Sequence, residues 1–143
     1  MNPKKIEHIG IAVDRLEESI PRYETLLGSP CYKTETVASQ GVITAFFKVG
    51  ESKIELLQPL DTSGPIAKFL QKHGQGMHHI AYAVEDIKAE MLRLTDQGFR
   101  LLNAQPVEGA DNKWVCFLHP KDATGVLTEL VQERESGFEF NQV

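Results

Sequence analysis

The chain contains an internal duplication, and this feature restricts its possible folds more than any other. Segment 6–13, Ile-Glu-His-Ile-Gly-Ile-Ala-Val, aligns with segment 77–84, Met-His-His-Ile-Ala-Tyr-Ala-Val, at an offset of 71 residues (79 minus 8). Both segments alternate in the manner of strands. Segments 53–58 and 127–132 share Glu-Leu-x-Gln at an offset of 74 (129 minus 55), so the second half carries only a small net insertion. The duplication predicts two similar modules.

Each module reads as a strand, a helix and further strands. After the first strand, apolar residues recur at helical spacing until Gly28, and after the second they do so until Gly98. Segments 41–49 and 113–119 are expected to be strands, followed by turns at 50–52 and 120–125. A strand near 31–38 is expected, and its counterpart near 99–107 is poorly defined. The expected organisation is a first module (1–58), a linker with a short amphipathic helix at Ile66, Phe69 and Leu70 (59–76), a second module (77–133) and a C-terminal tail without a core pattern (134–143).

Composition excludes several classes of protein. With 143 residues, 41% of them hydrophobic and 24% charged, the chain is sized for one compact domain or for two modules sharing a core. No apolar run is long enough to span a membrane, and no apolar signal region stands at the N-terminus, so a cytoplasmic protein is expected. Cys31 and Cys116 lack metal-site spacing and are expected to be reduced thiols. A net charge of −5 argues against nucleic-acid binding but allows a small anionic substrate.

The duplicated first strands each carry a histidine with only small neighbours on its own face. Alternation places His8 with Gly10 and Ala12, and His79 with Ala81 and Ala83. A face that filled its own core would carry larger side chains, so this pattern predicts a pocket.

Two glutamates complete the candidate site. By the same alternation Glu55 shares its face with Leu57, and Glu129 shares its face with Leu127 and Val131. A carboxylate among apolar residues is costly to bury without a positive partner. A single divalent cation would let both carboxylates and both imidazoles share one site. Three further histidines are left outside it: His78 points to the opposite face by alternation, His73 lies exposed in the linker, and His119, at a strand end, is a candidate for an outer-sphere role.

Several stretches together resemble the vicinal-oxygen-chelate superfamily, and within it the methylmalonyl-CoA epimerases. They span about residues 5 to 132 and are 8–13, 40–42, 54–59, 65–70, 78–81, 117–121 and 125–130. The resemblance implies an α+β fold in which two βαβββ modules form a cupped mixed sheet with the helices outside. It also implies that one divalent metal ion, cobalt, manganese, nickel or zinc, is held by His8, Glu55, His79 and Glu129. The position of Glu55 can be glutamine in relatives.

The resemblance further implies that methylmalonyl-CoA is epimerised by proton abstraction through a metal-stabilised enolate. Glu129 would be one base. Some relatives carry glutamate at the position of Thr44, and threonine cannot act as a base unaided, so we hypothesise that Glu55 is the second base. The expected substrate-binding residues are Gln40, Thr44, His119 and Lys121. Lys53, Lys113 and Lys121 are candidates for the coenzyme A phosphates, and a homodimer is the expected assembly.

Three alternatives stay open at this point. Lactoylglutathione lyase, a glyoxalase, uses the same His/Glu/His/Glu set, so the ligands alone do not separate it from an epimerase. A binding protein of the same fold is disfavoured by the complete ligand set. A duplicated domain without any site is the third.

Overall fold

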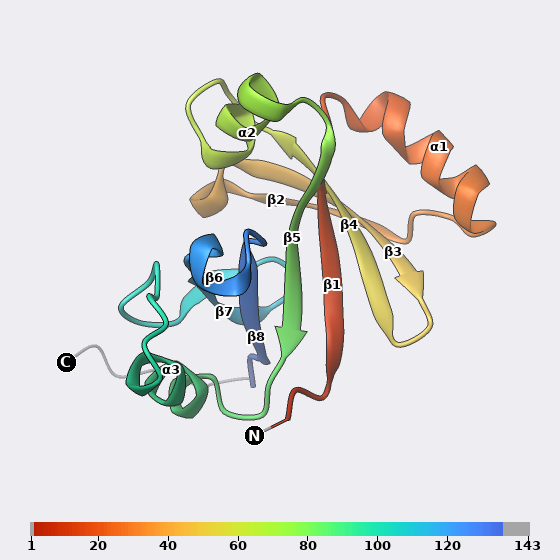
Figure 1. The fold of residues 1–143 in the computed structure, drawn as a ribbon. Coiled ribbons are helices and arrows are strands. Elements are labelled where there is room, and N and C mark those ends of the chain that lie inside the picture. Colours follow the sequence, from red (N-terminus) through yellow and green to blue (C-terminus); the bar gives the residue numbers. More distant parts are fainter. Residues whose placement is uncertain (1, 136–143) are drawn as a thin grey trace.

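A computed structural model describes residues 2–135 of the chain, and the part of the predicted tail from 136 to 143 lies outside the described residues. Within the described residues, eight strands and three α-helices follow the order of two βαβββ modules with a helix between them (Figure 1). The first module comprises β1 (Lys5–Ala12), α1 (Leu16–Leu27), β2 (Lys33–Val37), β3 (Val42–Val49) and β4 (Ser52–Pro59); then come α2 (Pro65–His73) and the second module, β5 (Gly76–Ala83), α3 (Ile87–Asp96), β6 (Val107–Gly109), β7 (Lys113–Leu118) and β8 (Thr128–Glu133).

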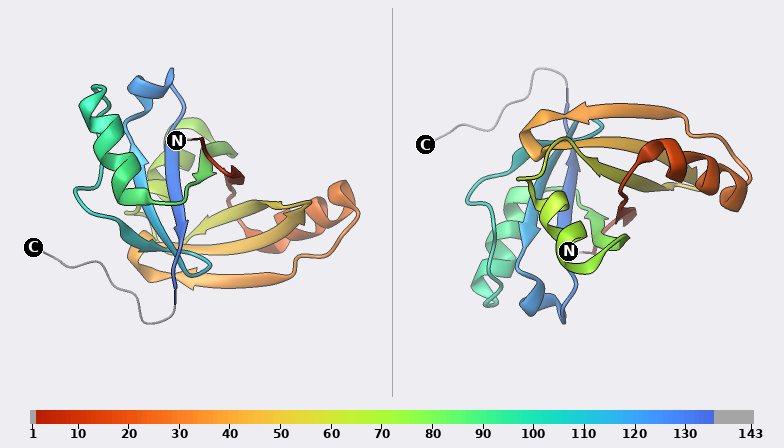
Figure 2. Two further views of the ribbon diagram at one scale, coloured as in Figure 1. Left: turned by 90° about the horizontal axis from the view of Figure 1, so that it is seen from below. Right: turned by 90° about the horizontal axis from the view of Figure 1, so that it is seen from above.

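The strands form one mixed sheet in the order β2-β3-β4-β1-β5-β8-β7-β6. β1 pairs with β4, and β5 with β8, in parallel, whereas the remaining pairs are antiparallel. The modules therefore join through β1 and β5 at the centre of the sheet. The sheet bends into a nearly closed cup (Figure 2). The predicted fold class, with its two modules and cupped sheet, is confirmed.

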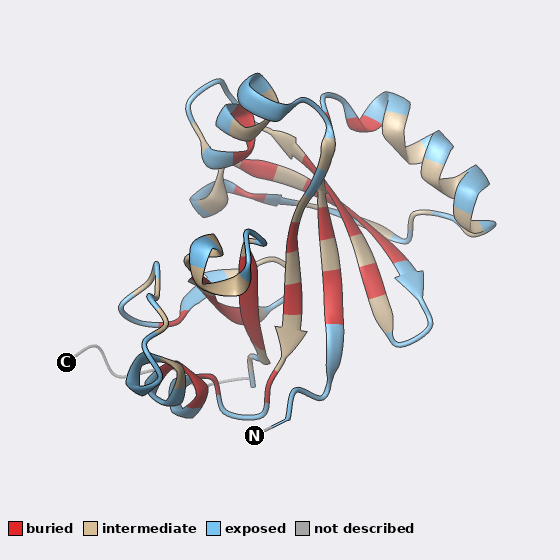
Figure 3. Ribbon diagram, viewed as in Figure 1, coloured by how far each residue is buried: buried red, intermediate tan, exposed pale blue. Residues whose placement is uncertain are grey.

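Helices α1 and α3 cover the outer face of the cup at equivalent places. The apolar side of α1, with Leu16 and Ile20, packs against Phe47 and Leu56 of the sheet. The chain leaves α1 at Gly28, whose φ of 67° is the left-handed conformation that glycine adopts without cost. In the second module, α3 packs in the same way on β7 and β8. Buried residues therefore concentrate along the central strands and the inner sides of the helices (Figure 3).

The predicted linker helix is present as α2. Ile66 is buried and packs against Leu57 and Ala12, so α2 covers one end of the cup. The poorly defined segment 99–107 contains an isolated bridge from Leu101 to Leu118 and reaches only the first residue of the three-residue strand β6. Among the described residues, no helix is long and apolar enough to cross a membrane.

Candidate metal-binding active site

Two rows of residues cross the middle of the sheet, and each row joins the histidine of one module to the glutamate of the other. In one row, Gly10 lies between His79 of β5 and Glu55 of β4. In the other, Ala81 lies between a histidine of β1 and a glutamate of β8, its register partners being His8 and Glu129. Residues in register project to the same face of a sheet. The duplication therefore brings all four predicted ligands to the inside of the cup.

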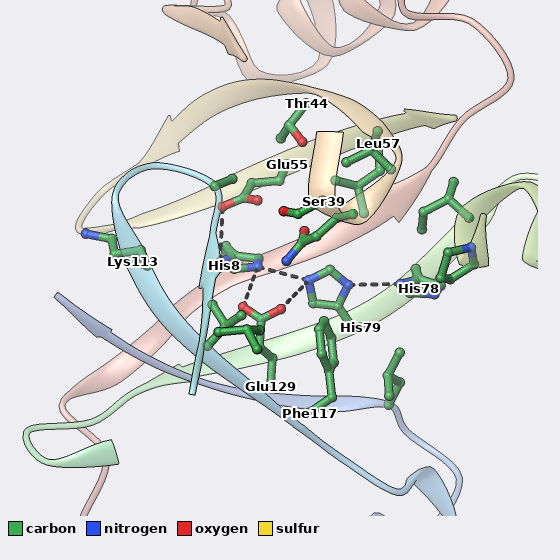
Figure 4. Close-up of a pocket in the computed structure, with 18 of the residues that line it drawn as sticks. His8, Ser39, Thr44, Glu55, Leu57, His78, His79, Lys113, Phe117 and Glu129 are labelled. Carbon is green, nitrogen blue, oxygen red and sulfur yellow. Dashed lines mark hydrogen bonds and ion pairs between the residues drawn. The ribbon is translucent and has the colours of Figure 1, made fainter. Parts of the chain in front are cut away.

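Three of the four side chains converge. The Nε2 atoms of His8 and His79 lie 2.9 Å apart, and the carboxylate of Glu129 lies 3.6 Å from the first and 3.7 Å from the second (Figure 4). One donor atom from each residue lies within 4.8 Å of the others, and all three residues are buried. This is a compact N/N/O donor set built from both modules.

Glu55 contacts the other nitrogen of the same imidazole. Its Oε2 lies 3.1 Å from His8 Nδ1 and 3.7 Å from the ammonium of Lys53. With Glu7 and His8 it forms a second buried group of potential ligands. The structure thus places Glu55 and Glu129 against opposite edges of one ring.

The charges at this site suit a cation. Burial raises the pKa of Glu129 to about 7 and also raises the pKa of Glu55. Burial, reinforced by the neighbouring His8, holds the pKa of His79 well below its ordinary value. A buried carboxylate becomes stable in its charged form when positive charge lies beside it. Imidazole nitrogens and carboxylate oxygens are the donors that divalent transition metals bind, so the residues fit such an ion.

The protonation of His8 depends on the same surroundings. Burial alone would lower its pKa, but the charges of Glu55 and Glu129 and the hydrogen bond to Glu7 raise it. For Glu7 itself, burial is outweighed by its bonds to His8 and Lys53, which hold its pKa at about 2.

His78 is a correction to the prediction from alternation. Its side chain lines the pocket, and its Nδ1 lies 3.0 Å from Nδ1 of His79 (Figure 4). The register between β1 and β5 jumps from His79 to Met77, so His78 is an extra residue in a β-bulge. A bulge redirects its residue, and strict alternation fails there. The prediction that His78 faces away from the site is wrong for this reason. Burial lowers its pKa to about 4.

The pocket above the donor set has a volume of about 570 Å³, which suits a small-molecule ligand. Of the expected substrate-binding residues, Gln40 and Thr44 line it, but His119 and Lys121 do not. His119 instead accepts a hydrogen bond at Nδ1 from the backbone N–H of Lys121, at the start of a short 3-10 helix.

Thr44 lies in the pocket wall on β3. It is fully buried, and among the described residues its Oγ1 has no hydrogen-bond partner. A buried hydroxyl without a partner is unfavourable.

The candidate phosphate-binding lysines occupy different settings. Lys53 is buried and bonded to Asp111 at 2.6 Å and Glu7 at 3.1 Å, which argues against a role with phosphates. Lys113 lines the pocket and pairs with the exposed Glu133 at 2.6 Å, a partner that a phosphate could replace.

Comparison with known proteins identifies the family. The model of the glyoxalase/bleomycin resistance protein/dioxygenase superfamily matches residues 7–117. The ethylmalonyl-CoA/methylmalonyl-CoA epimerase of Cereibacter sphaeroides is 43% identical over 130 residues, which cover 90% of this chain and 97% of that protein. The chain belongs to the methylmalonyl-CoA epimerase family of this superfamily. The human mitochondrial methylmalonyl-CoA epimerase is 41% identical over 132 residues, which cover 92% of this chain and 75% of the human protein.

Solved epimerase structures share the whole architecture. The methylmalonyl-CoA epimerase of Mycobacterium tuberculosis is 39% identical and superposes with a TM-score of 0.89. The aligned region covers 93% of this chain and 90% of that chain. An epimerase solved in complex with methylmalonyl-CoA and NH4+ is 36% identical, with 98% of this chain and all of the other chain covered and the same TM-score. Epimerases are isomerases, so the predicted enzyme class is confirmed.

Proposed function

We propose that this chain interconverts the two epimers of methylmalonyl-CoA, with a divalent metal ion held by His8, Glu55, His79 and Glu129. The observation that carries the proposal is the convergence of the two histidines and Glu129, from both modules, at the floor of a pocket. Membership of the epimerase family supports the choice of substrate.

The chemical difficulty of the reaction is to remove the α-proton and to stabilise the resulting enolate. A divalent ion bound here supplies Lewis acidity, which stabilises negative charge on the thioester oxygen by several kcal/mol. Phe117 and Leu57, which line the pocket, exclude water and strengthen every electrostatic interaction inside it.

Two bases are needed, one for each face of the α-carbon. Glu129 and Glu55 are the candidates because both carboxylates line the pocket, one at each nitrogen of the His8 ring. Glu129 lines the pocket beside both imidazoles, where a carboxylate can take up and return a proton. Thr44 offers the pocket only a hydroxyl, so we assign the second base to Glu55.

The test is exchange of the substrate α-proton in deuterated water, which reports enolate formation whatever the final product. Wild-type protein loaded with cobalt should incorporate deuterium at Cα, and a chelator should stop the exchange. Exchange that persists after the metal has been removed, as verified by metal analysis, would overturn the metal-dependent proposal.

The two bases are separated by Glu55→Gln and Glu129→Gln, each assayed with the metal content measured. A well-placed base contributes roughly 10²–10⁴-fold in rate, so either change should lower turnover by that order. If Glu55→Gln retains metal and near-normal turnover, Glu55 is not the second base.

The same exchange assay distinguishes the open alternatives. A glyoxalase would act on the glutathione hemithioacetal instead of methylmalonyl-CoA, and a binding protein would bind a ligand without exchanging its protons. The homodimer stays a prediction, which sedimentation analysis of the purified protein would test.

A further inference from the structure

The central strand pair contains two β-bulges placed at equivalent points of the duplication. The register between β1 and β5 shifts once between Ile6 and His8 and once between Gly10 and Ile11. The extra residue is Glu7 in the first bulge and His78 in the second. These residues differ in number by 71 (78 minus 7), the offset that relates the two histidine strands. Both modules therefore insert a polar residue directly before the histidine that faces the site.

Each bulge residue bonds to the Nδ1 atom of the histidine that follows it. Glu7 Oε1 lies 2.9 Å from Nδ1 of His8, and His78 Nδ1 lies 3.0 Å from Nδ1 of His79. Without the bulge, alternation would point each bulge residue to the other face of the sheet. The bulge is therefore what makes these two contacts possible.

We propose that Glu7 and His78 are positioning residues, whose bonds to Nδ1 turn the Nε2 atoms of His8 and His79 toward one metal ion. The inference rests on the proposed metal site. A neutral imidazole carries one proton, and a proton held on Nδ1 leaves the lone pair on Nε2 free for a metal. Outer partners of this kind fix the tautomer and the orientation of ligand histidines.

Both positioning side chains are themselves held in place. The ring of His78 packs edge-on against Phe69 of α2, with centroids 5.0 Å apart, and its plane is nearly perpendicular to that of His79. On the other side, Glu7 is buried and bonded to the ammonium of Lys53 at 3.1 Å. A rigid outer partner limits the rotation of the ligand ring, which is what a metal site of fixed geometry requires.

The His78 contact is the cleaner one to test, because Glu55 also lies 3.1 Å from Nδ1 of His8 and could replace Glu7 there. His78→Leu removes the acceptor for Nδ1–H of His79, whereas His78→Gln keeps a carbonyl oxygen that can accept it. His73→Leu is the matched control, since His73 is exposed on α2 and removes a histidine of the same neighbourhood without touching His79.

The first measurement is the Co²⁺ affinity of each protein by competition with a chelator. We expect His78→Leu to bind Co²⁺ about 10–100-fold more weakly than wild type. His78→Gln should recover most of this loss, and His73→Leu should bind like wild type. Melting of the metal-free proteins shows whether each variant is folded.

The second measurement is the proton NMR spectrum of the Co²⁺-loaded protein, in which the Nδ1–H protons of ligand histidines appear as paramagnetically shifted, solvent-exchangeable signals. Wild type should show two such signals that exchange slowly, and His78→Leu should lose one of them to fast exchange. Unchanged affinity and two slow signals in a folded His78→Leu would overturn the positioning role. Absence of Co²⁺ binding in wild type would instead overturn the metal site itself, and the inference with it.

Discussion

Gly10→Ala is expected to damage the active site while leaving the protein folded. Gly10 is the residue between His79 and Glu55 in the register of the sheet. A Cβ atom at this position would lie 2.1 Å from Cε1 and 2.5 Å from Nδ1 of the His79 ring. Its φ lies outside the left-handed region, so the substitution meets no backbone penalty and acts only through the added methyl group.

The structure gives the size of the effect. Ordinary van der Waals contact begins near 3.4 Å, so the imidazole must move by about 1.3 Å (3.4 minus 2.1) or the strands must separate. A misplacement of about 1 Å at a catalytic group can cost about 10²-fold in rate, which corresponds to ~2.7 kcal/mol of transition-state stabilisation. Overpacking adds about 1–3 kcal/mol of lost stability.

The assay is kcat/KM for methylmalonyl-CoA together with Co²⁺ affinity, with Gly76→Ala as the matched control. Gly76 lies on β5 opposite Ala12, and a Cβ atom there meets nothing within 4 Å. We expect a loss of about 100-fold in kcat/KM for Gly10→Ala and wild-type behaviour for Gly76→Ala. Full activity in a folded Gly10→Ala would refute the close packing of His79 on the β1 backbone.

Three further changes test the surroundings of the site. Thr44→Val replaces a buried hydroxyl that lacks a partner among the described residues. This change should raise the free energy of unfolding, measured in urea, by about 1 kcal/mol. A decrease would imply that the hydroxyl makes a hydrogen bond. Lys53→Met leaves Glu7 and Asp111 without their buried ammonium partner and should lower stability by about 3–5 kcal/mol; a neutral result in the same urea titration would contradict this role. Burial would raise the pKa of Asp111, but bonds from Lys33 and Lys53 outweigh it and hold this pKa at about 2, below the ordinary value of an aspartate. The stability that Asp111 contributes is therefore complete above about pH 4 and is lost as the pH falls toward 2. The difference in unfolding free energy between wild type and Asp111→Asn should disappear over that range. A difference that does not change with pH would argue against the ion pairs.

Periodicity and duplication were sufficient to predict the modules and the inward-facing side chains. Helices α1 and α3 begin and end close to the expected residues because their apolar positions recur every three or four residues. Glu55 and Glu129 face the inside of the cup as predicted, since nothing interrupts the alternation in β4 and β8. The assignment of these residues as metal ligands stays a prediction.

Strand alternation alone could not predict the two bulges or the ion pairs across the cup. A bulge inserts one residue and shifts the face of its side chain, so strict alternation misplaces His78 and overlooks Glu7. The offset of 71 residues relates these two polar residues as it relates His8 to His79, and this was the available signal. The bonds from Lys33 and Lys53 to Asp111 join segments more than 50 residues apart in the sequence, and no local sequence pattern predicts such contacts.

Anomalous diffraction from a crystal of the Co²⁺-loaded protein tests the shared metal site most directly. The expected result is one cobalt peak per chain, bonded to Nε2 of His8, Nε2 of His79 and the carboxylates of Glu129 and Glu55. A cobalt peak bonded to the residues of one module alone, or none at the floor of the pocket, would contradict it.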